Sequence, residues 1–220
     1  MIFFAAVDRL VSLVNPMSNT SPTPSQETRD RILEAAVNVF ASKGYHDAKV
    51  DDIVSESKTS KGSFYFYFPS KQDIFLALSD TFADLLEGRL TEAMTGKAHG
   101  LEQMDAALQS ALGLFSQYRG LAKVALVQAV GLGAVFEERR RALNNRLTRL
   151  VRERLDQAVA DGSIPSQQTE IAARAWVGAL GEVVTHWIYT GAPPLEESLP
   201  ALRQFLARSI GIPEDRLPPE

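Results

Sequence analysis

The chain has 220 residues, a length that suffices for one large domain or for two modest domains with their own cores. The absence of cysteine excludes disulfide frameworks and thiolate metal sites and is consistent with a reducing compartment, so the cytoplasm is the expected location. Lysine and arginine number 23 against 27 aspartates and glutamates, and the resulting net charge of −4 requires any nucleic-acid site to be a local basic patch.

The N-terminal residues fit a signal peptide poorly. They are apolar, but Asp8 and Arg9 interrupt them, and neither a basic start nor a small-residue cleavage site accompanies them. A stretch rich in Ser, Thr and Pro follows Met17, which makes residues 1–16 a candidate mis-assigned start; an amphipathic membrane-surface arm is the alternative, although its charged face would be sparse. We expect residues 1–24 to form a disordered extension.

From residue 25 onward apolar residues recur with the period of a helix and no segment alternates like a strand, so the predicted fold class is all-α. The first two predicted helices span residues 26–42 and 50–57. A third begins near residue 60 and a fourth at residue 70. The later helices span 101–118, 137–160, 167–189 and 195–210. The apolar run at 124–136 contains Gln128 and two glycines and is short for a bilayer, so it is interpreted as a buried helix.

Local signals mark several helix ends. Ser25 is the expected N-cap of the first helix, and Gly44 stands where a left-handed residue ends it. Ser60 is the expected cap of the third helix. Ser70 would cap the fourth, with Asp73 near the positive end of its dipole.

Residues 44–68 have the pattern of a helix, a tight turn at 57–59 and a second helix. The second of these helices would expose serine, lysine and aromatic side chains that can contact phosphates and base edges. Between Lys58 and Lys71 there are three lysines and no acidic residue, a local charge of +3 in an acidic chain. The segment therefore has the basic patch that a groove-entering helix requires.

From about Thr28 to Leu78 the chain resembles the N-terminal domain of the tetracycline-repressor (TetR) family of bacterial regulators. The residues that carry the resemblance are, in order, Arg31 to Ala36, Phe40, Gly44, Tyr45, Val50, Asp52, Ile53, Ser60 to Tyr65, Tyr67, Phe68, Ser70 and Lys71. Beyond about Leu90 the similarity is limited to the number and length of the helices and to the final helix pair.

The resemblance implies a helix-turn-helix DNA-binding domain at 25–70 and a helical regulatory and dimerisation domain at 71–212. The three prolines of residues 213–220 predict a flexible tail. It implies a homodimer, paired through its last two helices, that places two recognition helices in successive major grooves of a palindromic operator. A small hydrophobic effector would release this repressor from DNA, although an operator placed differently would make it an activator.

The resemblance also implies functional residues. Those expected to bind DNA are Lys49, Thr59, Ser60, Lys61, Ser63, Tyr65, Phe66, Tyr67 and Lys71. Those expected to line an effector cavity are Phe115, Leu126, Val130, Phe136, Trp176 and His186. Two positions depart from the family pattern. Lys49 replaces the usual threonine cap, and Lys58 stands where relatives carry glycine, which would cost about 1–2 kcal/mol if the residue is left-handed.

The same residues allow other interpretations. The aromatic run 64–68 could stack single-stranded bases, but its spacing favours Phe64 and Phe68 in the core, and an exposed Phe66 could contact a thymine methyl. Glu182 and His186 lack a third metal ligand, and the charged run 137–141 is interpreted as a solvated helix start that could otherwise meet an anionic ligand.

No enzyme constellation and no cofactor motif emerges, so we expect neither catalysis nor a cofactor or metal. The alternatives to a ligand-released repressor are a ligand-insensitive DNA-binding protein and an interaction adaptor. Loss of salt-sensitive, sequence-selective DNA binding would favour the adaptor.

Overall fold

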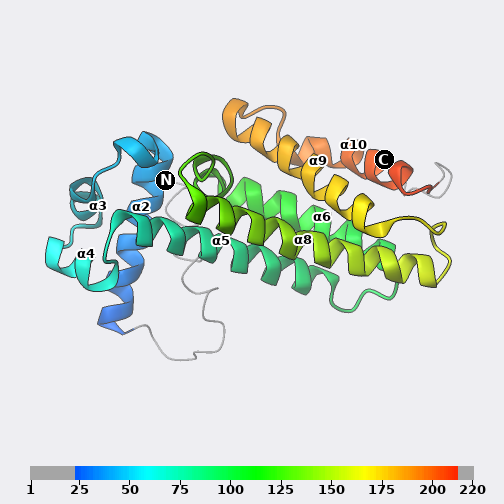
Figure 1. The fold of residues 1–220 in the computed structure, drawn as a ribbon, viewed down its shortest axis with the longest axis horizontal. Helices are drawn as coiled ribbons and strands as arrows, with labels where there is room; N and C mark the ends of the chain where they lie inside the picture. The colour runs from blue at the N-terminus through cyan, green and yellow to red at the C-terminus, as the bar shows by residue number, and fades with distance from the viewer. Residues whose placement is uncertain (1–22, 213–220) are drawn as a thin grey trace. The chain divides into compact units, whose positions relative to one another are not determined.

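The computed structural model describes residues 23–212, and the predictions for residues 1–22 and 213–220 lie outside that range. The described residues form helices and no strand, which confirms the all-α prediction (Figure 1). The elements are α2 (Pro24–Asp47), α3 (Val50–Ser57), α4 (Lys61–Tyr67), α5 (Lys71–Met94), α6 (Gly100–Gln117), α7 (Arg119–Ala122), the π-helix η1 (Lys123–Gln128), α8 (Ala134–Ala160), α9 (Thr169–Thr190) and α10 (Leu195–Ser209).

The chain divides into two compact units. The first contains the described residues up to Leu85 together with Tyr118–Arg140, and the second contains Leu86–Gln117 and the described residues from Arg141 onward. This division differs from the boundary predicted after residue 70, because the segment 118–140 packs with the N-terminal helices.

Helix α2 is the centre of the first unit. Its predicted inward face is buried, with Ile32, Ala36 and Phe40 fully inaccessible to solvent. The predicted N-cap was wrong: Thr23 caps the helix by accepting a hydrogen bond from the backbone of Gln26 at 3.3 Å. The helix therefore begins two residues earlier than a cap at Ser25 would place it, since threonine and serine can both cap a helix.

The C-terminal end of α2 is defined by Gly44, whose φ of 81° interrupts the helical backbone as predicted. Two side chains of the η1 π-helix satisfy the carbonyls just before it: Lys123 donates to Ala41 O and Gln128 to Phe40 O, each at 2.7 Å. Helical carbonyls near a C-terminus have no partner within the helix, so these bonds tie η1 to α2.

The prediction of one buried helix across 124–136 was wrong in part. The π-helix ends at Gln128, and Gly131 and Gly133 follow with φ of 77° and 116°, conformations that glycine adopts readily. Val130 is 58% exposed as a result, and the next helix, α8, begins at Ala134 rather than at residue 137.

The second unit has its own apolar core. It is formed by Met104 on α6, Leu155 and Ala158 on α8, Ile164, Ala173 on α9 and Ile210. Helices α9 and α10 are joined there by a hydrogen bond from the indole Nε1 of Trp176 to Ser209 Oγ at 2.9 Å. Within the described range, no helix combines the length and the apolar character needed to cross a bilayer.

Candidate nucleic-acid interface

The turn between α3 and α4 has the predicted geometry. Helix α3 ends at Ser57, and Lys58 adopts a left-handed conformation with φ 53° and ψ 40°, the one non-glycine residue with positive φ among those described. The buried hydroxyl of Ser57 hydrogen-bonds that of Thr59 at 2.8 Å and holds the turn. Helices α2, α3 and α4 form one three-helix cluster around this turn (Figure 1).

Helix α4 is capped as its sequence predicts. Ser60 Oγ accepts a hydrogen bond from the backbone N–H of Ser63 at 3.0 Å, and the two hydroxyls lie 2.9 Å apart. Because both hydroxyl groups are at the start of the helix, they can also reach a phosphate or base edge.

The aromatic residues of α4 separate into two groups. Phe64 and Phe68 are buried, which confirms that the i, i+4 pair belongs to the core. Tyr65 and Phe66 are 52% and 77% exposed and point away from the core. Tyr67 is only partly exposed, since its hydroxyl is hydrogen-bonded to Ser25 Oγ at 2.8 Å. The structure therefore brings an exposed aromatic surface beside the cap of α4.

Lys61 lies at the first position of α4 and is exposed. Its Nζ forms an ion pair with Asp51 on α3 at 2.7 Å, and this carboxylate raises the pKa of the lysine. A phosphate would have to compete with Asp51 for the ammonium group. Asp51 is an acidic residue in the first turn of α3, but its sequence position alone does not reveal that it lies beside Lys61.

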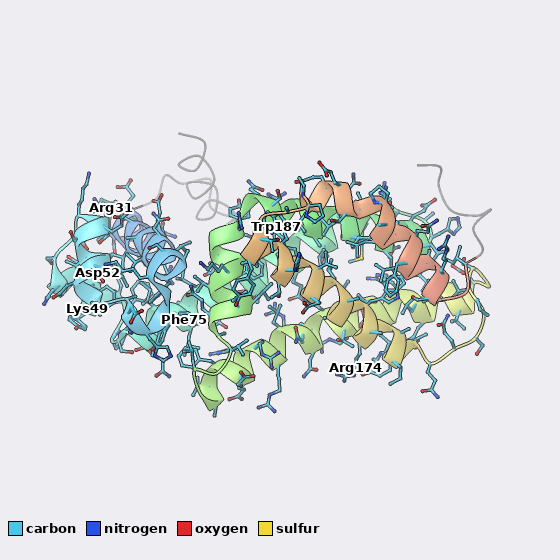
Figure 2. All side chains as sticks on the ribbon, turned by 90° about the horizontal axis from the view of Figure 1, so that it is seen from above. Arg31, Lys49, Asp52, Phe75, Arg174 and Trp187 are labelled. Atoms are coloured by element: carbon cyan, nitrogen blue, oxygen red, sulfur yellow. The ribbon has the colours of Figure 1, made fainter. Side chains whose placement is uncertain are left out.

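Lys49 is at the N-cap position of α3 and makes no side-chain capping bond, whereas Asp52 accepts the backbone N–H of this cap residue. The Asp52 carboxylate accepts the Lys49 backbone N–H at 3.0 Å and pairs with Lys43 at 2.9 Å. Lys49 and Asp52 are labelled in Figure 2. These two bonds, the one from Lys43 first, lower the pKa of the carboxyl group. The Lys49 side chain remains exposed and available to solvent.

Lys71 has a different environment from the one predicted. Its ammonium group donates to the carbonyls of Tyr45, His46 and Ala48 at 2.7, 3.3 and 2.9 Å, and it lies 4.5 Å from the centre of the Tyr45 ring. It therefore fixes the connection from α2 to α3. A phosphate contact by Lys71 stays a prediction.

Tyr45, in the segment that joins α2 to α3, packs in an aromatic cluster of the first unit. Its ring lies 5.8 Å from Phe40, 5.0 Å from Phe75 and 5.4 Å from Phe136, with centroids as the reference points. Phe75 is labelled in Figure 2. Tilted and edge-on ring pairs of this kind stabilise a core. In the sequence, Tyr45 is visible only as part of the family resemblance, and its place in this cluster is not predicted.

The six residues predicted to line an effector cavity do not belong to one unit. Leu126, Val130 and Phe136 lie in the first unit, and Phe136 is buried in the aromatic cluster. Phe115, Trp176 and His186 lie in the second unit, where Phe115 is buried and His186 is exposed. Their role in ligand binding stays a prediction.

The charged run 137–141, a possible anion site, forms ion pairs within the protein. Two arginines of the run 137–141 form ion pairs, Arg139 with Asp80 at 3.4 Å and Arg140 with Glu137 at 2.8 Å. Among residues 23–212, no cluster of three or more metal-ligating side chains is found.

Known proteins are similar to this chain, both in the helix-turn-helix segment and over most of its length. The profile of the family described as "Bacterial regulatory proteins, tetR family" matches residues 32–78, which span α2 to the first half of α5. The HTH-type transcriptional regulator YdgC of Bacillus subtilis is 28% identical over 166 residues, covering 75% of this chain and 83% of that protein. The fatty acid metabolism regulator protein of the same organism is 28% identical over 163 residues, covering 72% and 82%.

Solved structures share the fold over most of the chain. The fatty acid degradation regulator FadR from Bacillus halodurans has a TM-score of 0.75 at 22% identity, covering 85% of this chain and 96% of that one. FadR from Bacillus subtilis, solved with stearoyl-CoA, has a TM-score of 0.74 at 21% identity, covering 84% and 98%. At these identities the likeness concerns the fold. The matched profile identifies residues 32–78 as a helix-turn-helix domain of the TetR family, and over most of its length the chain is similar to helix-turn-helix transcriptional regulators.

Proposed function

We propose that this regulator is a cytoplasmic repressor that binds a palindromic operator as a homodimer and leaves it when a small hydrophobic effector binds. The observation that carries the proposal is the surface of α4. Its N-terminus is capped by Ser60, Lys61 lies at its first position, and Tyr65 and Phe66 are exposed on it.

The size of α4 suits the major groove. An α-helix with its side chains is about 10–12 Å in diameter, which matches the major-groove width of about 12 Å, and the seven residues of α4 form such a helix. Lys49 and Lys58 are exposed on either end of α3 and supply positive charge close to this helix. Contacts from lysines and hydroxyl groups to phosphates would orient α4, and side chains on α4 would read base edges.

A mobility shift on the DNA upstream of the protein's own coding sequence, and on duplexes selected from a random pool, tests this step. We expect selective binding that weakens with salt, because lysine–phosphate contacts release counterions. The Asp51→Asn variant should bind several-fold more tightly than the wild type, because Lys61 then loses its competing carboxylate. Binding without sequence selectivity by the wild type would contradict the proposal.

The last two helices supply the proposed dimer surface. Ile171 and Tyr189 on α9 and Phe205 on α10 are each more than half exposed, and small residues such as Ala175 and Gly178 lie between them on exposed positions of α9. Apolar side chains gathered on one helix pair favour a protein–protein contact, and a symmetric dimer would bury the same surface twice.

Light scattering after gel filtration tests the dimer. The wild type should have twice the mass of the 24.1 kDa chain, and Phe205→Glu should shift it toward the monomer. Gln204→Glu, a neighbouring exposed position on α10, is the matched control for added charge. A monomeric wild type at micromolar concentration would contradict the proposed pairing.

An acyl-thioester is the effector class that the comparisons support best. FadR from Bacillus subtilis shares the fold and was solved with stearoyl-CoA, and a fatty acid metabolism regulator is among the sequence relatives. Two of the proposed lining residues in the second unit, Phe115 and Trp176, are aromatic, which suits contact with an acyl chain. The effector would lower operator affinity only by as much as it prefers the DNA-free conformation.

Operator release and thermal shift with acyl-CoA of increasing chain length test this part. Long-chain acyl-CoA should raise the melting temperature and release the operator, whereas free coenzyme A should do neither at the same concentration. Operator binding that persists with every acyl-CoA and every small apolar compound would favour a ligand-insensitive DNA-binding protein instead.

A further inference from the structure

The most exposed large apolar side chain among residues 23–212 is Phe66, at 77%. It lies on α4, between Phe64 and Phe68, which are buried. A phenylalanine at this level of exposure contributes little to the core. Full burial of such a side chain is favourable, so a partner that covers the ring would gain affinity from it.

The ring of Phe66 is held in place although it is exposed. It makes an edge-on contact with Tyr67, with centroids 4.9 Å apart and planes at 88°. The Tyr67 hydroxyl is in turn bonded to Ser25 at 2.8 Å. A ring supported in this way loses less conformational freedom on binding than a mobile one.

The residues beside Phe66 on the same face of α4 are small. Gly62 is four positions earlier and has no side chain, and the nearest atom that a Cβ there would meet is Ser60 Oγ at 3.6 Å. Ser63, three positions earlier, is also short. The backbone of α4 can therefore approach a surface closely, with the Phe66 ring as the projecting apolar group.

The major groove offers one apolar group to such a ring, the 5-methyl group of thymine. We propose that Phe66 determines sequence specificity by packing on a thymine methyl in each half-site of the operator. This inference rests on the proposed DNA-binding function. The hydroxyl and ammonium groups near the start of α4 provide polar contacts, and Phe66 adds an apolar one that selects thymine at one position.

Replacing thymine by deoxyuridine removes the methyl group alone and leaves the base-pairing edge unchanged. An operator selected with the full-length wild type is therefore resynthesised with deoxyuridine at one symmetric pair of thymines at a time. At one position the wild type should lose about 4-fold in affinity per half-site, the factor that corresponds to about 0.8 kcal/mol for one buried methyl group.

Phe66→Ala should bind the thymine and deoxyuridine duplexes equally at that position, and Phe66→Leu should retain part of the difference. Circular dichroism establishes that each variant is folded, and deoxyuridine at the other thymines is the control for altered duplex structure. If no thymine position distinguishes the wild type from Phe66→Ala, the inference is wrong although selective binding stands. If the wild type selects no operator at all, the proposed function itself fails.

Discussion

The two units differ in the polar contacts within them, because the first unit adds to its ion pairs a set of side-chain bonds to backbone carbonyls. In the first unit, Lys71, Lys123 and Gln128 donate to backbone carbonyls between residues 40 and 48. In the second unit, polar contacts between helices include ion pairs such as Arg203–Asp105 and Arg152–Glu170, whose side chains are about one-third to two-fifths exposed. Bonds to carbonyls that a helix leaves unpaired fix a backbone, whereas partly exposed ion pairs are screened by solvent.

This difference between the units bears on function. A surface that reads DNA needs its helices fixed within a fraction of an ångström, and the first unit achieves this at the junction of α2 with α3. We therefore expect substitutions of polar residues to be more costly in the first unit.

The largest effect should come from the aromatic cluster. Phe40 is completely buried and contacts the rings of Tyr45 and Phe75, so Phe40→Ala should lower the free energy of unfolding by about 3–5 kcal/mol. Chemical denaturation followed by circular dichroism measures the change. Leu155→Ala, at an equally buried site of the second unit, should cost about 2–5 kcal/mol. A loss below 1 kcal/mol for Phe40→Ala would show that the cluster does not stabilise the fold.

Two substitutions of cationic side chains, one in each unit, test the difference between the units. Lys123→Met leaves the Ala41 carbonyl without its charged donor and should cost about 1.5–3 kcal/mol. Arg203→Met removes an ion pair that is partly exposed and should cost at most about 1 kcal/mol. Denaturation curves of the two variants under the same conditions give the difference. Equal losses, or a larger loss for Arg203→Met, would remove the distinction between the units.

A smaller effect of opposite sign is expected at the turn before α4. Lys58 is left-handed, a conformation that costs a non-glycine residue about 1–2 kcal/mol, so Lys58→Gly should stabilise the protein by up to about 1 kcal/mol after the entropy of glycine is deducted. Lys58→Ala is the control, because it removes the charge and keeps the strain. Destabilisation by glycine relative to alanine would contradict the account.

The smallest effect concerns pH. Hydrogen bonds from Lys43 and from the Lys49 backbone lower the pKa of Asp52, so the carboxylate stabilises the native state above its unfolded pKa, and this contribution is lost as the pH falls through the lower native value. The stability difference between wild type and Asp52→Asn should therefore be largest near neutral pH and should shrink in acid. Thermal melts across that range measure it, and a difference independent of pH would contradict the assignment.

The sequence predicted those features that depend on neighbouring residues. The caps at Ser60 and Ser70, the left-handed Gly44 and the exposed aromatic residues of α4 all follow from local pattern. The first N-cap was misplaced by two positions, because Thr23 and Ser25 are both suitable residues and nothing local distinguishes them.

Features that depend on tertiary contacts could not be predicted in this way. The role of Lys71 requires the carbonyls of residues 45–48, and the break after η1 shows only once Gly131 and Gly133 adopt positive φ. The predicted effector residues are mostly apolar, and apolar character does not distinguish a residue that lines a cavity from one that packs in the core. Phe136 illustrates this, since it is part of the aromatic cluster of the first unit.

The central claim is that α4 reads DNA, and salt-dependent binding to a selected operator tests it most directly. Lys61→Ala should weaken binding and reduce the slope of log affinity against log salt by about one phosphate contact. Lys97→Ala, an exposed lysine of the second unit, should change neither quantity. An unchanged affinity and slope for Lys61→Ala, or equal losses for both variants, would contradict the assignment of α4 as the recognition helix.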